Sequence, residues 1–164
     1  MLFRSNPTAS SLSLGGLYLQ YASAGGTFTG TPLALNNVTL APGQYYLVQC
    51  AAGTNTAAPA LPTPDQSNCT FAMGASSFKI ALTSSTAAPT ATAGSVSGGN
   101  LVDFVGAAAN QYEGTAAAPA PSNTTSLLRA GNGCTDTDQN STDFAAGTPT
   151  PRNTAAAANT CSTP

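Results

Sequence analysis

The chain has 164 residues and a net charge of −2, from four Lys or Arg and six Asp or Glu. So few cations cannot neutralise a run of phosphates, which argues against a nucleic-acid partner. Histidine is absent, so Ser-His and Cys-His catalysis and histidine-ligated metals are excluded. No apolar run approaches the ~18 residues of a membrane-spanning helix, so we expect no membrane span.

Short apolar runs between turn residues predict an all-β chain. Sixteen Gly and twelve Pro are spread along the sequence and would interrupt any helix of ordinary length. In chain order, strands are predicted at residues 12–14, 17–21, 33–40, 44–50, 78–83, 101–106 and 126–129. Long loops rich in Ala, Thr and Pro are predicted at 51–70, 84–100 and 107–124. Short strands with turn-rich connections are typical of a β-sandwich.

Alternation along the strands predicts which side chains face solvent. In residues 78–83 the register places Lys79 on the solvent side. Tyr18 and Tyr21 fall on opposite faces of their strand, and so do Tyr45 and Tyr46, so we expect one of each pair in the core. The other could join an aromatic patch that binds a glycan, although no Trp is present to strengthen it.

The cysteines are Cys50, Cys69, Cys134 and Cys161, widely spaced and without a Cys-x-x-Cys pair. A zinc site made of all four is the alternative to two disulfides, and the spacing disfavours it. Three disulfide connectivities are possible. We favour Cys50–Cys69 with Cys134–Cys161, because each bond closes a compact, turn-rich segment. Disulfides form in oxidising compartments, so we expect a secreted or extracellular protein.

Several motifs follow one another in a characteristic order. They are Asn-Pro-Thr at 6–8, Leu-Ser-Leu-Gly-Gly-Leu-Tyr-Leu at 12–19, Ala-Pro-Gly-Gln-Tyr-Tyr-Leu-Val at 41–48, Leu-Val-Asp-Phe-Val-Gly at 101–106, Ser-Leu-Leu-Arg at 126–129, Asp-Thr-Asp-Gln-Asn at 136–140, Asp-Phe at 143–144 and Thr-Pro-Arg-Asn at 150–153. In order and spacing they resemble the lamin tail domain, in the version found in secreted bacterial proteins.

That resemblance implies an immunoglobulin-like β-sandwich. We expect an all-β domain of this kind over residues 1–153, with long Ala/Thr/Pro-rich loops, and a tail at 154–164 tied by a disulfide. Two departures from the family stand out. Leu2-Phe3-Arg4-Ser5 replaces the family's longer first strand, which contains Glu, and Leu17 stands where the family favours Trp. Residues 1–5 offer a single cation, and no apolar segment of a leader peptide follows them. We therefore expect either an excised mature domain or, as we favour, a reading frame truncated at its start that cuts the first strand short.

The resemblance also implies a function. Bacterial lamin tail domains often accompany secreted nucleases or phosphatases as recognition or tethering units. We therefore expect a non-catalytic accessory domain outside the cell, with a structural or protein-interaction role and a protein or a cell-surface glycan as partner. The alternative is a ligand-binding module, for a glycan or calcium, attached to a secreted hydrolase or nuclease. Fold alone does not decide between them.

An acidic turn is a candidate calcium site. Its oxygen-bearing residues, at nearly alternate positions, are Asp136, Asp138, Asn140 and Asp143. Hard cations such as Ca²⁺ bind clustered carboxylates in such turns, but the EF-hand pattern fails at Ser141 and Gly147, where Gly and a bidentate Glu are needed. The alternative is a network of Asx turns that caps backbone N–H groups before Phe144 is buried. No other cofactor is expected.

Three further charged residues are expected to be structural. Asp103 lies inside an apolar strand, where a carboxylate needs hydrogen-bond partners. A catalytic pair of Asp103 and Glu113 is the alternative, because glycoside hydrolysis uses two carboxylates that flank a cleft. Arg129 and Arg152 are expected to pair with the acidic turn and hold the C-terminal segment on the sheet, with phosphate binding as the alternative.

Overall fold

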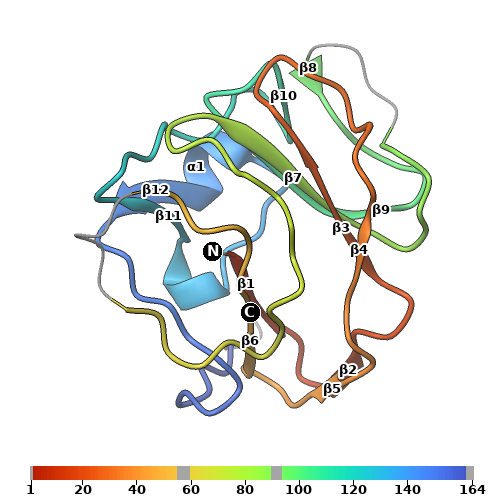
Figure 1. The fold of residues 1–164 in the computed structure, drawn as a ribbon. Coiled ribbons are helices and arrows are strands. Elements are labelled where there is room, and N and C mark those ends of the chain that lie inside the picture. Colours follow the sequence, from red (N-terminus) through yellow and green to blue (C-terminus); the bar gives the residue numbers. More distant parts are fainter. Residues whose placement is uncertain (1, 55–59, 90–93, 162–164) are drawn as a thin grey trace.

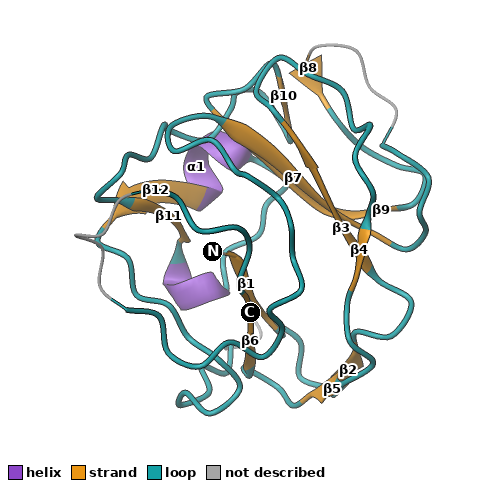
Figure 2. Cartoon of the chain, in the orientation of Figure 1, coloured by secondary structure: helices purple, strands orange, loops and turns teal. Residues whose placement is uncertain are grey.

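The computed structural model describes residues 2–54, 60–89 and 94–161. Residues 55–59 and 90–93 of the predicted loops, and 162–164 of the predicted tail, lie outside the described residues. Within the described part the chain is mostly strands, turns and loops (Figure 1, Figure 2). Its helices are the short α1 (Asn140–Asp143) and the 3-10 helix η1 (Gly131–Gly133). The prediction of an all-β chain is confirmed.

Twelve strands are described. They are β1 (Leu2–Ser5), β2 (Leu12–Ser13), β3 (Tyr18–Ala22), β4 (Leu33–Ala34), β5 (Thr39–Leu40), β6 (Tyr45–Val48), β7 (Phe78–Thr83), β8 (Gly94–Ser95), β9 (Leu101–Ala107), β10 (Gln111–Tyr112), β11 (Ser126–Arg129) and β12 (Phe144–Gly147). The largest sheet is antiparallel with the order β4-β3-β7-β9. The pairs β1–β6, β2–β5 and β11–β12 are also antiparallel, whereas β8–β10 is parallel.

The main core lies against one face of the four-stranded sheet. Leu19 of β3 lies opposite Leu82 of β7, and Ile80 lies opposite Val105 of β9, so these side chains share that face. Tyr46, on β6, packs with them in the same cluster. The turn at 41–43 brings β6 there, and Gly43 has a φ of +71°, as expected for Gly in that turn. A Cβ at Gly43 would also lie 2.5 Å from the backbone of the C-terminal segment.

Most predicted strands are confirmed with small changes of boundary. The exceptions are short: residues 12–14 and 33–40 contribute the two-residue strands β2, β4 and β5. Residues 2–5, where a shortened first strand is expected, form β1, which is paired along its length with β6. Strands β8 and β10 lie inside predicted loops, because two-residue pairings leave no periodic pattern to read. Helix α1 and β12 were not predicted either.

The solvent-facing position predicted for Lys79 is wrong. Lys79 is 0% exposed, and its ammonium donates hydrogen bonds to the Gly26 carbonyl oxygen, to Asn110 Oδ1 at 2.9 Å and to Gln111 Oε1 at 2.7 Å. Burial lowers the pKa of Lys79 below its usual value. Alternation correctly places Lys79 on the face opposite Ile80. It could not show that segments around residues 26 and 110 cover that face.

For Tyr45 and Tyr46, the expectation of one core side chain is met by Tyr46, but the other is not exposed, because Tyr45 is 0% and Tyr46 1% exposed. Tyr46 lies in the core and donates a hydrogen bond to Gln66 Oε1 at 3.0 Å. Tyr45 faces the other way and is covered by Arg152, whose guanidinium lies 4.8 Å from the ring centroid and donates to the Tyr45 hydroxyl. Tyr18 and Tyr21 are each half-buried.

Both favoured disulfides are present, Cys50–Cys69 and Cys134–Cys161. No cysteine in the described residues is free, so the zinc alternative is wrong. The second bond holds Cys161 beside η1. Thr154 donates to the Asp65 carboxylate through its N–H and its hydroxyl, so the segment after residue 153 is attached at its start as well as at Cys161.

Candidate binding cavity

A cavity of about 490 Å³ is lined both by the four-stranded sheet and by β11. The sheet contributes apolar side chains, among them Leu19, Ile80 and Leu82, and β11 contributes Leu127 and Leu128. Both β11 leucines are half-buried, so they are not sealed inside the core. The volume falls within the ~300–1,000 Å³ of ligand-binding pockets, which are mostly apolar with a few polar groups.

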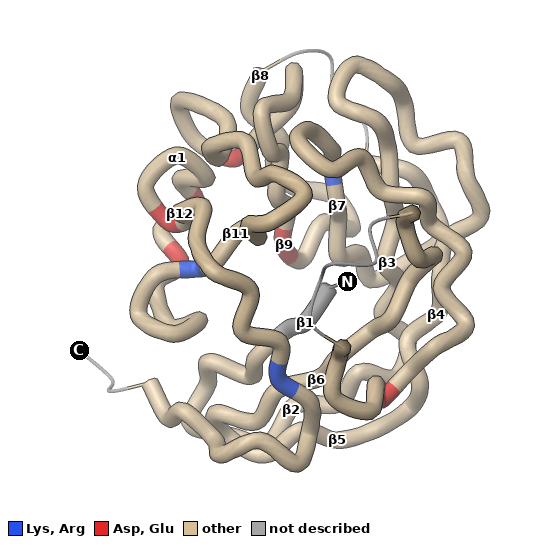
Figure 3. The backbone as a smooth tube through the Cα atoms, turned by 60° about the vertical axis from the view of Figure 1, so that its left-hand side comes forward, with Lys and Arg blue, Asp and Glu red and all other residues tan. Residues whose placement is uncertain are grey.

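An ion pair in the cavity wall joins the sheet to β11. Arg129 Nη2 lies 2.9 Å from both carboxylate oxygens of Asp103, which is 6% exposed. The guanidinium also lies 2.7 Å from Asp136 and 4.4 Å from the ring centroid of Phe144. Figure 3 shows this gathering of charged residues beside β11, β12 and α1. The structural role expected for Asp103 and Arg129 agrees with these contacts, since each satisfies the other's buried charge.

Arg152 does not join that network. Its described contacts are the Tyr45 ring and hydroxyl and Asn132 Oδ1 at 3.4 Å, so the expected pairing with the acidic turn is not seen there. Arg152 also lines this cavity. It still holds the C-terminal segment on a strand, because Tyr45 belongs to β6. The partner is an aromatic side chain rather than a carboxylate, which the sequence pattern did not indicate.

The Asp143 carboxylate of the acidic turn is bound by residues of the turn itself. Asp143 is 1% exposed and accepts hydrogen bonds from Thr137 N–H at 2.8 Å, Thr137 Oγ1 at 2.7 Å and Gln139 N–H at 3.2 Å. Burial alone would raise the pKa of Asp143, but these hydrogen bonds and the nearby Arg129 lower it below its usual value. This is the pattern of the Asx-turn alternative: a carboxylate that caps backbone N–H groups.

Asn140 connects the turn to the sheet. Its Nδ2 donates to the Phe104 carbonyl oxygen at 2.9 Å, and its Oδ1 accepts from the N–H groups of Gly106 at 2.8 Å and Glu113 at 3.2 Å. Its amide is therefore bound to the edge of β9 and is not free to ligate a cation. Asp138, by contrast, is exposed.

These placements bear on the calcium hypothesis. Among the described residues, no group of three or more His, Cys, Asp or Glu side chains is arranged to hold a metal ion. Asp136 faces Arg129, Asp143 caps the turn and Asn140 binds β9. The four predicted ligands are close in sequence, but three of them are directed to other partners. Calcium binding stays a prediction without geometric support.

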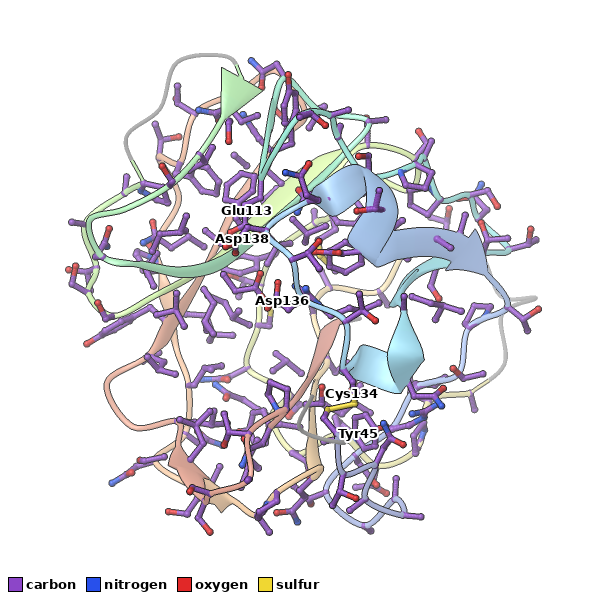
Figure 4. All side chains as sticks on the ribbon, turned by 180° about the vertical axis from the view of Figure 1, so that it is seen from behind. Tyr45, Glu113, Cys134, Asp136 and Asp138 are labelled. Atoms are coloured by element: carbon purple, nitrogen blue, oxygen red, sulfur yellow. A yellow bond between two sulfur atoms is a disulfide. The ribbon has the colours of Figure 1, made fainter. Side chains whose placement is uncertain are left out.

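Glu113 is a buried carboxyl whose surroundings the sequence did not predict. It is 6% exposed and accepts a hydrogen bond from Asn140 Nδ2 at 3.3 Å. Burial, reinforced by the carboxylates of Asp136 and Asp138, raises the pKa of Glu113 to about 7. Figure 4 shows the three carboxylates near one another and away from Tyr45. No local pattern marks this Glu, because its neighbours come from residues 136–140.

Across residues 2–54, 60–89 and 94–161, none of the helices has the length and apolar character needed to cross a bilayer. No protein-family model, no curated protein and no solved structure matches the chain. The resemblance to the lamin tail domain therefore stays a prediction that rests on the motifs, and function has to be argued from the geometry.

Proposed function

We propose that this chain is a non-catalytic interaction domain that works outside the cell, built as a lamin-tail-like, immunoglobulin-like β-sandwich. The observation that carries the proposal is the apolar cavity between the sheet and β11, in whose wall Asp103 and Arg129 are held in an ion pair. An apolar cavity of this kind suits binding, since the binding free energy comes from burying the apolar surface of a partner.

The sandwich architecture is supported by the layout of the sheets. One layer is the four-stranded sheet, and β6 packs its Tyr46 and Val48 side chains against it from the other side. The two disulfides support an extracellular site, since such bonds persist in oxidising compartments. An accessory role in tethering or recognition fits a domain held together in this way.

The placement of the carboxylates favours binding over catalysis. Asp103 is held by Arg129, and Glu113 accepts from the amide of Asn140. Asp103 and Glu113 line different hollows of the surface, so the two carboxylates considered for a glycosidase-like pair do not flank one cleft. Tyr45 cannot contribute to the predicted glycan-binding aromatic patch, because it is buried beneath Arg152.

The proposal is tested by selecting displayed random peptides on the purified chain and on a cavity-filling variant, Leu127→Trp. We expect peptides that bind the wild type and lose at least tenfold in affinity for Leu127→Trp. The matched control is Leu12→Trp, which adds the same ring at a position 38% exposed and outside the cavity. Peptides that bind all three proteins equally would contradict the proposal. So would turnover of phosphoesters, DNA or glycosides that Asp103→Asn abolishes.

A further inference from the structure

The outer edge of β11 carries main-chain groups that no described strand pairs. Immediately beyond the β11–β12 ladder, in the same register, the Ala130 N–H donates a hydrogen bond to the Asp143 carbonyl oxygen at 2.8 Å. Hydrogen-bonded and non-hydrogen-bonded pairs alternate in an antiparallel ladder, so the N–H and C=O groups of Leu127 and Arg129 point away from β12. Among the described strands, β12 is the one neighbour of β11.

Strand β1 presents a second edge of the same kind. The Asn6 N–H bonds to the Gln44 carbonyl oxygen at 2.9 Å, so by the same alternation the main-chain groups of Phe3 and Ser5 point away from β6. Ser5 and every residue of β11 line the one cavity, and the Ser5 hydroxyl reaches the Gly133 carbonyl oxygen just beyond β11 at 3.4 Å. Two strand edges therefore border one apolar space.

The cavity wall also contains an unsatisfied hydroxyl. Ser126 Oγ, on β11, is buried and has no hydrogen-bond partner. Buried polar groups in folded proteins are nearly always paired, because an unpaired one loses its bonds to water without replacement. An occupant that brings hydrogen-bonding groups to β11 would satisfy it, whereas a purely apolar ligand would not.

Charge indicates one more property of the occupant. Arg152 lines the cavity, and no carboxylate of the described residues lies within ion-pair distance of it. Its contacts are the ring and hydroxyl of Tyr45 and the amide of Asn132. An acidic group on the occupant would complement this guanidinium. The neighbouring cation Arg129 is already paired with Asp103 and Asp136.

We infer that the cavity binds an extended peptide, which adds a strand to the edge of β11 beside β1, with apolar side chains turned into the cavity and an acidic residue toward Arg152. The inference rests on the proposed function and names its partner class. Strand addition uses main-chain hydrogen bonds for affinity and alternate side chains for specificity. The four residues of β11 span about 13 Å at ~3.3 Å per residue, so a strand of four to six residues matches the edge.

The test uses the full disulfide-bonded chain and a fluorescent eight-residue peptide of alternating valine and threonine that ends in glutamate. Its partner probe has the same side chains but N-methyl groups on alternate residues, on the edge that would face β11. We expect fluorescence polarisation to show saturable binding of the first peptide. Loss of two main-chain hydrogen bonds should weaken the N-methylated peptide about thirtyfold. Replacing the glutamate by glutamine should weaken binding to the wild type but not to Arg152→Gln.

Two results would overturn the inference. Equal binding of both peptides would show that the cavity accepts apolar side chains or lipid-like chains without pairing to a strand. Absence of binding by both would show that the edge is closed to peptides. A protein variant adds a second check: Leu127→Pro removes an outward N–H that the ladder with β12 does not use, and it should weaken binding at least about fivefold while the far-ultraviolet spectrum is retained. The peptides selected in the test of the proposed function can also be made in N-methylated form. If the N-methylated peptides bind the protein as tightly as the unmodified ones, this inference is wrong, but the proposed function still holds.

Discussion

Replacing Glu113 by Gln should stabilise the protein at pH 8 and leave its stability at pH 4 unchanged. Glu113 has a pKa of about 7 in the folded chain, against 4.5 for an unperturbed Glu. Below pH 4.5 both states hold the proton, so the group has no effect on stability. As pH rises from 4.5 to 7 the unfolded state loses the proton first, so stability falls. Above pH 7 the loss is complete.

The magnitude follows from the size of the shift. A difference of about 2.5 pKa units, at ~1.36 kcal/mol per unit, corresponds to about 3 kcal/mol of lost stability above pH 7. Gln carries no charge and keeps an oxygen that can accept from Asn140. Glu113→Gln should therefore gain about 3 kcal/mol at pH 8. With a typical urea m-value of ~2 kcal/mol/M the unfolding midpoint should rise by about 1.5 M.

The assay is urea unfolding of both proteins at pH 4 and pH 8, followed by circular dichroism with the disulfides intact. Titration of other groups cancels in the difference between the two proteins at each pH. Asp138→Asn is the matched control, because it removes one like charge near Glu113 and keeps the carboxyl. It should raise the midpoint at pH 8 in the same direction by less. A variant Glu113→Gln that is no more stable at pH 8 than at pH 4, relative to wild type, would refute the reasoning.

Four further variants test the contacts that hold the fold. Arg129→Met should lower the free energy of unfolding by about 3–5 kcal/mol, because it leaves buried carboxylates without their cation. Arg152→Met should lower it by about 1 kcal/mol, since it removes a contact with an aromatic ring. Equal losses in urea midpoint for the two variants would contradict this. Replacing Cys134 and Cys161 together by Ser should cost about 3–4 kcal/mol for a separation of 27 residues, and an unchanged thermal midpoint would contradict it. Lys79→Met should cost about 1–3 kcal/mol at pH 7, since its oxygen partners lose their donor, and a raised urea midpoint would show that relief of the buried charge dominates.

Arg129 and Lys79 show which contacts of a single residue can be predicted from the sequence. Arg129 was expected to pair with the acidic turn, and it does, because both lie in one short C-terminal stretch. Lys79 was assigned to solvent from alternation within its own strand, yet Asn110 and Gln111 close over it. The first expectation depended on a contact seven residues apart, and the second on one about thirty residues away.

The sequence by itself determined the properties that are local or compositional. Turn residues and short apolar runs dictate strands, and the cysteine spacing favoured the two disulfides that form. Only the tertiary structure decided which groups are buried together. The cavity, the two strand edges beside it and the raised pKa of Glu113 arise from segments far apart in the chain. Burial and main-chain pairing depend on what packs across the fold, and no pattern within one strand encodes that.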